Sequence, residues 1–338
     1  MKKSGFILFN RFFIILLLTF FCGLRGTYVG LDYINYMEIF QQVPTLYSLS
    51  KGYDEIHGEF LYLFINSVIK TFTSDSVFVF LFIAFLTALI NIYNFNKYSP
   101  FFILSVLLYF SHFYLNKDFI QIRTALSSAI LYFTIPYILN KNFFKFSIVV
   151  AIASLIHSAA IVMFFVYFYS FIEFSKKRVF IILAITILLS FTNWLHFILE
   201  ILTNYNILPY SVKLYIGSEY DYPLGLLNPI TIKQIIILGF FTIYYNFYNK
   251  LKYFRVMYNM YFLSTIWIIL FSEFAIIAAR VATFMSIVEV IILPMIILKF
   301  KYKKTIYILL VLFAFFVLNI NIFFREVVDN YYFIEGFL

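Results

Sequence analysis

The chain has 338 residues, a net charge of +9 and only 12% charged residues, whereas 64% of its residues are hydrophobic and its mean hydropathy is +0.94. Nearly every stretch between polar breaks is long enough to cross a hydrocarbon core about 30 Å thick, which excludes an ordinary soluble domain. The lysines lie in short groups at the ends of apolar segments, which favours membrane topology over a nucleic-acid-binding surface. We predict an all-α polytopic integral membrane protein, with residues 1–338 as a single transmembrane domain and no nucleic-acid partner.

The amino-terminal segment, MKKSGFILFNRFFIILLLTFFCGLRG, begins with a basic stretch and continues as an apolar run close to a full span. It contains no small-x-small cleavage site, so we expect an uncleaved signal anchor with its amino end in the cytoplasm. Cys22 is the single cysteine, which excludes an internal disulfide and a metal site built from cysteines.

Apolar segments with polar flanks recur along the whole chain, and no internal repeat or linker divides them. We predict about 11 crossings, within a range of about 10 to 12, because each segment approaches the length that a membrane helix needs. The predicted crossings are residues 6–23, 76–95, 100–115, 119–139, 143–156, 158–173, 179–201, 229–248, 256–272, 276–298 and 305–323.

Basic residues set the expected orientation, since lysine and arginine concentrate on the cytoplasmic side of membrane proteins. The clusters that we place inside are Lys2, Lys3 and Arg11; Lys176, Lys177 and Arg178; Lys250, Lys252 and Arg255; and Lys299, Lys301, Lys303 and Lys304. Residues 24–75 then form the first outer loop, residues 203–228 form the second, and the acidic carboxy terminus lies outside.

The segment 57–73 admits two topologies because it is short and contains two charged residues. If it is a re-entrant or interfacial helix of the first outer loop, Lys97, Lys141 and Lys145 lie inside, as the charge rule requires. If it spans the membrane, residues 143–173 form one broken crossing and those three lysines lie outside. We favour the first topology.

Three ionisable residues lie in apolar sequence: Arg123 in FIQIRTALSSAI, Arg280 in FAIIAARVATF and His157 in ASLIHSAAI. A charge at the bilayer centre costs roughly 2.5 to 3.5 kcal/mol on the mildest insertion scale, so such residues face a protein interior or a wet cavity. In the favoured topology all three lie near the outer face with charged residues of the first outer loop. Those loop residues are Arg25, Asp32 and Glu59. In the other topology Arg123 moves to the cytoplasmic side and His157 lies at mid-membrane.

A surplus of arginine over carboxylate at an outward-facing membrane site suits an anion, because guanidinium offers a fork of donors that matches phosphate oxygens. A lipid-linked pyrophosphate fits this description. If a sugar leaves from such a carrier, the pyrophosphate departs without a proton, so arginines stabilise the developing charge while one base activates the acceptor hydroxyl. No pair of acids is required, in contrast to glycoside hydrolysis.

The first outer loop begins RGTYVGLDYINYMEIF. If residues 31–40 are helical, Asp32, Asn35 and Tyr36 share one face by their i, i+3 and i+4 spacing. A carboxylate, an amide and a phenol suit the hydroxyl groups of a sugar. The alternative interpretation is a polar helix face that is merely solvated.

Five short motifs then occur in the order found in a known family. They are R-x4-G-L-D-Y-x2-Y, GEFLYLFIN, RTALSSAI, LIHSAAI and AARVATF. Their order over roughly residues 5–300 resembles that of the EpsG-type, Wzy-like polymerases of bacterial surface polysaccharides. Each motif is short, so the specificity lies in the order and not in any single match.

The resemblance implies a polymerase that transfers a growing glycan from undecaprenyl pyrophosphate to the next lipid-linked repeat unit, on the outer side of the bacterial cytoplasmic membrane. It also implies a fold similar to the metal-independent GT-C class of membrane glycosyltransferases, without a cofactor, and a chain-length regulator as a candidate partner. By motif match, the substrate-binding candidates are Arg25, Tyr36, Glu59, Arg123 and Arg280, and the candidates for base or acceptor contact are Asp32 and His157.

The chain departs from some polymerases of the wider group because it lacks their long arginine-rich outer loop. The best substitute is the segment 203–228, with Lys213, Glu219, Tyr220 and Asp221. Each candidate also has a structural alternative: Arg123 could pair with a carboxylate to fix helix packing, and His157 could cap a turn. Glu289, on the opposite side of its helix from Arg280, is expected to be a packing or interhelical group.

Two other classes of function stay open. A transporter or flippase of lipid-linked oligosaccharide also needs cations in the membrane, but the chain shows no paired, interrupted helices in corresponding positions of two repeats. A membrane acyltransferase that modifies surface polysaccharide would use a histidine facing the cytoplasm. No metal-binding motif is present, since there is no H-E-x-x-H sequence and the four histidines are scattered, so we expect no metal site.

Overall fold

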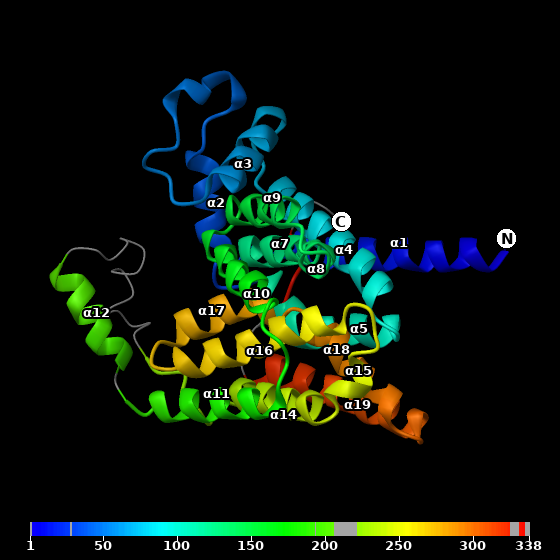
Figure 1. The fold of residues 1–338 in the computed structure, drawn as a ribbon. Helices are drawn as coiled ribbons and strands as arrows, with labels where there is room; N and C mark the ends of the chain where they lie inside the picture. Colours follow the sequence, from blue (N-terminus) through cyan, green and yellow to red (C-terminus); the bar gives the residue numbers. More distant parts are fainter. Residues whose placement is uncertain (1, 28, 193, 206–221, 325–330, 335–338) are drawn as a thin grey trace. The chain divides into compact units, whose positions relative to one another are not determined.

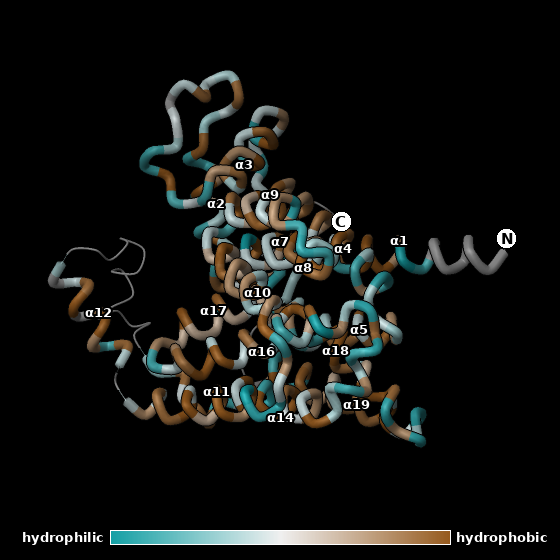
Figure 2. Tube along the Cα trace, in the orientation of Figure 1, coloured by the Kyte–Doolittle hydropathy of each residue, from teal (hydrophilic) through white to brown (hydrophobic). Residues whose placement is uncertain are grey.

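A computed structural model describes residues 2–27, 29–192, 194–205, 222–324 and 331–334. These residues form helices and no β-strand, apart from one isolated antiparallel bridge between Arg25 and Phe333. The predicted all-α class is therefore confirmed over the described ranges. In Figure 2 hydrophobic residues run along helices such as α11 (Lys176–Leu189), the distribution that a membrane helix requires.

Three helices of the described residues are long and apolar enough to cross a membrane: Val77–Tyr98, Ile122–Leu139 and Lys303–Phe323. The number rises to five if each of two interrupted helix pairs counts as one span, and the other predicted crossings, except 100–115, correspond to apolar helices of 10–17 residues. The segment 100–115 contains the eight-residue α-helix Phe102–Tyr109. A total of 11 crossings and a GT-C-like arrangement stay predictions.

The chain divides into two compact units, and unit 1 comprises residues 1–134, 143–161 and 290–338. Its helices before residue 100 are α1 (Lys2–Gly23), α2 (Tyr33–Gln42), η1 (Leu46–Lys51), α3 (Phe60–Phe72) and α4 (Val77–Tyr98). Next come α5 (Phe102–Tyr109), η2 (Phe110–Tyr114), α6 (Leu115–Lys117), α7 (Ile122–Leu131) and α9 (Phe143–Ser154), with η3 (Ser158–Val162) at the boundary. Its last helices are α18 (Glu289–Met295), η4 (Ile296–Lys299), α19 (Lys303–Asn319) and η5 (Ile320–Phe324).

Helix α4 is the centre of unit 1, because it packs against both α1 and α7, and α7 packs in turn against α9 (Figure 1). Aromatic rings from α2 and α3 fill the space beside it: Tyr33 stacks on Phe80 with ring centroids 4.2 Å apart, and Tyr62 is fully buried. Such ring pairs add to the stability that burial of apolar surface provides.

Two tertiary contacts fix the ends of α3, α7 and α9 relative to one another. The Leu155 carbonyl, just after α9, accepts the Leu61 amide of α3 at 2.8 Å. The Ser127 hydroxyl of α7 donates to the Ala153 carbonyl of α9 at 2.8 Å. The last carbonyls of a helix have no partner within it, and these bonds give donors to carbonyls at the end of α9. They also join three segments that are distant in sequence.

The segment 57–73 contains a 13-residue helix, α3. At 1.5 Å per residue it is about 20 Å long, which is short of a hydrocarbon core of about 30 Å. Helix α9, which we predicted to be a crossing, has only 12 residues. Length therefore does not separate the two topologies, and the interfacial position of α3 stays a prediction.

Unit 2 comprises residues 135–142 and 162–289. Its described helices are α10 (Met163–Tyr169), α11 (Lys176–Leu189), α12 (Trp194–Asn204), α14 (Pro229–Ile243), α15 (Tyr245–Tyr248), α16 (Phe254–Leu270) and α17 (Ala275–Ser286), and α8 (Thr134–Leu139) begins at its boundary. Helix α16 packs against α11, α14 and α17. Glu289 accepts from Lys233 Nζ at 2.7 Å and from Tyr261 Oη at 3.0 Å, so its predicted interhelical role is confirmed.

Two crossings predicted as continuous are interrupted. The segment 179–201 divides into α11 and α12, and 276–298 divides into α17 and α18. At the end of α11 the hydroxyls of Ser190 and Thr192 donate to the carbonyls of Ile187 and Leu189, at 2.7 and 2.6 Å. Hydroxyl side chains that take main-chain carbonyls compete with the helical hydrogen bonds, which explains why the apolar pattern continues where the helix stops.

Candidate functional site

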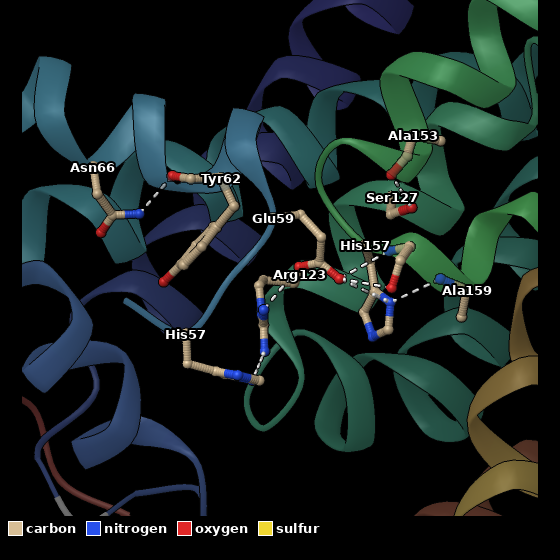
Figure 3. Close-up of polar contacts among 10 residues, drawn as sticks. His57, Glu59, Tyr62, Asn66, Arg123, Ser127, Ala153, His157 and Ala159 are labelled. Carbon is tan, nitrogen blue, oxygen red and sulfur yellow. Dashed lines mark hydrogen bonds and ion pairs between the residues drawn. The ribbon is translucent and has the colours of Figure 1, made fainter. Parts of the chain in front are cut away.

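The candidate site of unit 1 lies where three helix ends meet. Glu59 immediately precedes α3, Arg123 is the second residue of α7, and His157 lies between α9 and η3. The contacts of Leu155 with α3 and of Ala153 with α7 hold these ends together. Residues separated by about one hundred positions in the chain are thereby placed within one polar cluster (Figure 3).

Glu59 is the centre of this cluster. Its Oε2 accepts from Arg123 Nη1 at 2.8 Å, and its Oε1 accepts from the amide and the hydroxyl of Ser158 at 2.8 and 3.0 Å. Both oxygens of the carboxylate therefore have partners. Glu59 also lies at the start of two helices, α3 and η3, where the unpaired amides favour a negative charge.

Two histidines border the ion pair, as Figure 3 shows. His157 Nδ1 lies 3.8 Å from Glu59 Oε1, and the Ala159 amide points at the same nitrogen from 3.4 Å. On the other side, His57 Nε2 lies 3.4 Å from Arg123 Nη2. The structure thus gathers two of the four histidines at one carboxylate and one guanidinium.

The Glu59 carboxylate is partly buried, with 21% of its side chain exposed. Burial alone would raise its pKa, but the Arg123 charge, the Ser158 amide and the charge of His157 oppose this, and the pKa of Glu59 lies below its ordinary value. Glu59 is therefore ionised near neutral pH. It is available both to balance Arg123 and to stabilise a positive charge on His157.

Aromatic rings enclose the inner side of Arg123. The guanidinium carbon lies 5.8 Å from the ring centroid of Tyr36 and 5.5 Å from that of Tyr62, within the range of cation–π attraction. Both tyrosines are buried, and 14% of the Arg123 side chain remains exposed. The rings hold the arginine in place, while its outer edge carries the contacts with Glu59 and His57.

Gly58 makes the approach of Glu59 to Arg123 possible. Its φ is +151°, a backbone conformation that residues other than glycine rarely adopt, and an added Cβ would lie 2.9 Å from Leu63 Cδ2. With this conformation between them, His57 and Glu59 both contact the Arg123 guanidinium.

Arg25, a predicted substrate ligand, has different surroundings. It is fully buried, and it donates from Nε to the Val29 carbonyl at 3.1 Å and from Nη1 to the Cys22 carbonyl at 2.6 Å. Its guanidinium lies over the rings of Tyr33 and Phe80. The structure does not bring Arg25 to the Glu59 cluster, and a substrate role for it stays a prediction.

The three residues of the predicted sugar-binding face of the first outer loop differ in exposure in the structure. The expected helix exists as α2, but Tyr36 is buried against Arg123 whereas Asn35 is exposed and Asp32 is partly exposed. The aromatic residues of α2 turn toward the core, and a shared sugar-binding face of Asp32, Asn35 and Tyr36 stays a prediction. Tyr36 contacts Arg123 both through its ring and through a side-chain hydrogen bond.

Arg280 lies on α17 of unit 2 and is partly exposed. The carboxylate of the nearby Glu273 binds elsewhere: it accepts from the amides of Leu195 and His196 at the start of α12, at 3.4 and 3.1 Å. Most of the proposed acceptor loop, including Lys213, Glu219, Tyr220 and Asp221, lies outside the described residues.

Sequence reasoning missed three members of the cluster: His57, Tyr62 and Ser158. His57 and Tyr62 belong to the segment HGEFLYLFIN that contains Glu59, and Ser158 follows His157 directly. Their proximity to charged residues in sequence was the available signal. Within the described ranges no three His, Cys, Asp or Glu side chains are grouped closely enough to hold a metal ion.

The described residues thus define an all-helical protein with apolar helices of membrane-spanning length and a polar cluster at the ends of three of its helices. The EpsG family model matches residues 8–335, so the chain belongs to the EpsG family, and the resemblance indicated by the motifs is confirmed. The chain is 28% identical over 284 residues to the amylovoran biosynthesis protein AmsC of Erwinia amylovora, a match that covers 81% of this chain and 76% of that protein. No solved structure shows a significant match.

Proposed function

We propose that this protein polymerises a bacterial surface polysaccharide, by transferring the growing glycan from undecaprenyl pyrophosphate to an acceptor repeat unit on the outer face of the cytoplasmic membrane. Membership of the EpsG family and similarity to a protein of amylovoran biosynthesis support the substrate class. The observation that carries the proposal is the cluster of Glu59, Arg123 and His157, which offers a cation, an orienting carboxylate and a base in one place.

Arg123 is the proposed ligand of the donor pyrophosphate. Its Nη1 is engaged by Glu59, whereas Nη2 faces His57 at 3.4 Å on the exposed side of the cluster. A phosphate oxygen that binds between Nη2 and His57 would keep the Glu59 ion pair intact. The guanidinium retains its charge at any working pH, so it can stabilise the negative charge that develops as the pyrophosphate leaves.

His157 is the proposed general base. A shortening of about 1 Å would convert its 3.8 Å separation from Glu59 into a hydrogen bond, and catalytic hydrogen bonds are commonly long in unliganded sites. In the structure Nδ1 accepts from the Ala159 amide at 3.4 Å. In the proposed mechanism Nδ1 instead carries a proton that it donates to Glu59, which leaves Nε2 to accept the proton of the acceptor hydroxyl. The carboxylate then stabilises the imidazolium.

The reaction balances without a further reactant. The acceptor oxygen bonds to the anomeric carbon of the donor glycan, the bond from that carbon to the phosphate oxygen breaks, and undecaprenyl pyrophosphate leaves with the electron pair. His157 takes the proton and releases it to water. Asp32, just before the helix that carries Tyr36, is the alternative base, and Arg25 and Arg280 stay proposed substrate ligands on the family resemblance alone.

The remaining parts of the proposal follow from the same resemblance. They are a multi-pass protein of the bacterial cytoplasmic membrane with a cytoplasmic amino terminus, a metal-independent glycosyltransferase reaction, and a chain-length regulator as partner. The exposed apolar helices, such as Lys303–Phe323, of which 11% is buried, support a lipid environment.

The test is polymerisation of lipid-linked repeat units by the purified full chain in lipid nanodiscs. His157→Gln should lower the rate by about 10² to 10⁴ because it removes the base, and Arg123→Ala should abolish long chains on lipid-linked glycan gels. His196→Gln is the matched control, since His196 is exposed on α12 in unit 2 and should leave the rate unchanged. Normal chain lengths with both site variants, at normal folded yield, would show that the assignment is wrong.

A further inference from the structure

A cavity of about 640 Å³ lies in unit 1 between the chain that connects α2 with α3 and the carboxy-terminal part of α3. Its volume falls within the range of about 300 to 1,000 Å³ that is typical of small-molecule sites. The residues that line it include Thr45, Ser48, Tyr53, Asp54, Glu55 and Lys70. Hydroxyls, carboxylates and one aromatic ring are the groups that recognise a sugar.

The cavity contains two carboxylates that the protein itself does not use. The side chains of Asp54 and Glu55 are exposed, and in the described part of the chain neither has a hydrogen-bond or ion-pair partner. Ionised carboxylates accept strong hydrogen bonds from hydroxyl groups. Both are therefore available to a ligand.

Lys70, the cation of the cavity wall, is already engaged. Its Nζ donates to the carbonyls of Gln41 and Val43 at the end of α2, at 2.6 and 2.8 Å. Lysine in this position satisfies carbonyls that a helix leaves unpaired at its carboxy terminus. The named lining residues therefore carry two carboxylates against one ammonium, and this negative balance disfavours uronic acids and other anionic sugars.

Tyr53 gives the cavity a fixed apolar surface. Its hydroxyl donates to Ser67 Oγ at 3.0 Å, and its ring meets Phe60 edge to face with centroids 6.1 Å apart. Two contacts from α3 thus hold the ring at the cavity wall. A ring held in this way can pack against the C–H face of a pyranose without losing much conformational entropy.

The cavity adjoins the Glu59 cluster along the chain. Residues 53–56 line the cavity, and His57, the next residue, faces Arg123. Consecutive Cα atoms are about 3.8 Å apart, so a ligand in the cavity lies beside the segment that carries both His57 and Glu59.

From these observations we infer that the cavity is a subsite for an uncharged sugar of the oligosaccharide substrate, recognised by the carboxylates of Asp54 and Glu55 and by the ring of Tyr53. The inference rests on the proposed function for the identity of the substrate. It adds a binding site outside the Glu59 cluster and a selectivity for uncharged over acidic sugars.

The experiment measures binding of free monosaccharides directly, by saturation-transfer difference NMR with the full chain in lipid nanodiscs. The probes are glucose, N-acetylglucosamine and glucuronate. Glucose or N-acetylglucosamine should bind and glucuronate should not. The double variant Asp54→Asn with Glu55→Gln should bind about tenfold more weakly, because it loses charge-assisted hydrogen bonds.

The matched control is Glu38→Gln, an exposed carboxylate of α2 that does not line the cavity, and it should bind as the unmodified protein does. Absence of any signal, equal binding of glucuronate and glucose, or unchanged binding by the double variant would each overturn the inference. Arg123→Ala should lose polymerisation but keep the sugar signal. If the unmodified protein bound glucose yet formed no polymer from lipid-linked repeat units, the proposed function would fail while the subsite stood.

Discussion

Arg25 and Arg123 are both arginines of unit 1 with aromatic rings around them, but their polar partners differ in kind. Arg25 is completely buried and donates to main-chain carbonyls of its own helix end and loop. Arg123 keeps 14% of its side chain exposed and meets a glutamate and a histidine from another segment. The first arrangement fixes the chain, whereas the second leaves part of the guanidinium at the surface of the described residues.

The surroundings extend this contrast. Near Arg25, the buried Asp118 accepts from Tyr109 Oη at 2.6 Å, and Cys22 Sγ donates to the Asp118 carbonyl at 3.1 Å. Near Arg123, by contrast, Glu59 binds the first residue of η3 and borders a histidine. The hydrogen-bond partners of Arg25 are thus mainly main-chain carbonyls, whereas Arg123 pairs with a carboxylate at a partly exposed position.

The largest expected effect is on stability and separates the two arginines. Arg25→Ala should lower the free energy of unfolding by about 3–5 kcal/mol, because it empties an aromatic cage and leaves two buried carbonyls without donors. Arg123→Ala should lower it by only about 1–2 kcal/mol, since its ion pair is partly solvated. Thermal unfolding of the purified variants in detergent measures both losses of stability. Equal losses would contradict the expected difference between Arg25 and Arg123.

The two carboxylates should respond to pH with opposite sign. Burial raises the pKa of Asp118 to about 7, with Tyr109 and Arg25 opposing the rise. The folded state then holds a proton that the unfolded chain releases near pH 3.8. The resulting stabilisation of the folded state, on the order of 4 kcal/mol, is present in full at acid pH and is lost as the pH rises from about 4 to 7.

Glu59 has a lowered pKa, so its contribution is present above the unfolded value of 4.5 and is lost as pH falls through the folded pKa. Unfolding curves of the two variants between about pH 3 and 8 test these expectations. Asp118→Asn should remove the loss of stability with rising pH, and Glu59→Gln should remove the loss of stability with falling pH. A variant whose pH profile matches that of the unmodified protein would contradict the assigned titration.

The smallest effect concerns the geometry of the Arg123 cluster. Gly58→Ala places a side chain at φ +151°, which costs about 1–3 kcal/mol and shifts Glu59. We expect about tenfold slower polymerisation, because misplacing an orienting group by a fraction of an ångström weakens catalysis. Gly239→Ala in α14, where an added Cβ meets nothing within 4 Å, is the control and should be as active as the unmodified protein. Equal rates for the two variants would show that the Gly58 conformation does not position the site.

Much of the fold was predictable because transfer into a membrane depends on local composition. Helices occur in every predicted crossing, and α2 begins within two residues of the expected start. The interruption after Leu189 was not predictable from hydropathy, since hydroxyl groups that bind main-chain carbonyls hardly change the apolar average. At the interruption after Ser286, the Ser286 hydroxyl likewise donates to the Thr283 carbonyl, at 3.5 Å. Such breaks depend on hydrogen bonds that no periodicity reports.

The sequence by itself determined the helical membrane class, the order of family motifs and the unusual character of Arg123 and His157, because each follows from short stretches of residues. Only the tertiary structure decided that Glu59 binds Arg123, 64 positions away, and Ser158, 99 positions away, while Arg25 is enclosed by the core. The physical reason is that a buried charge requires a partner, and which partner it finds depends on how distant helix ends pack.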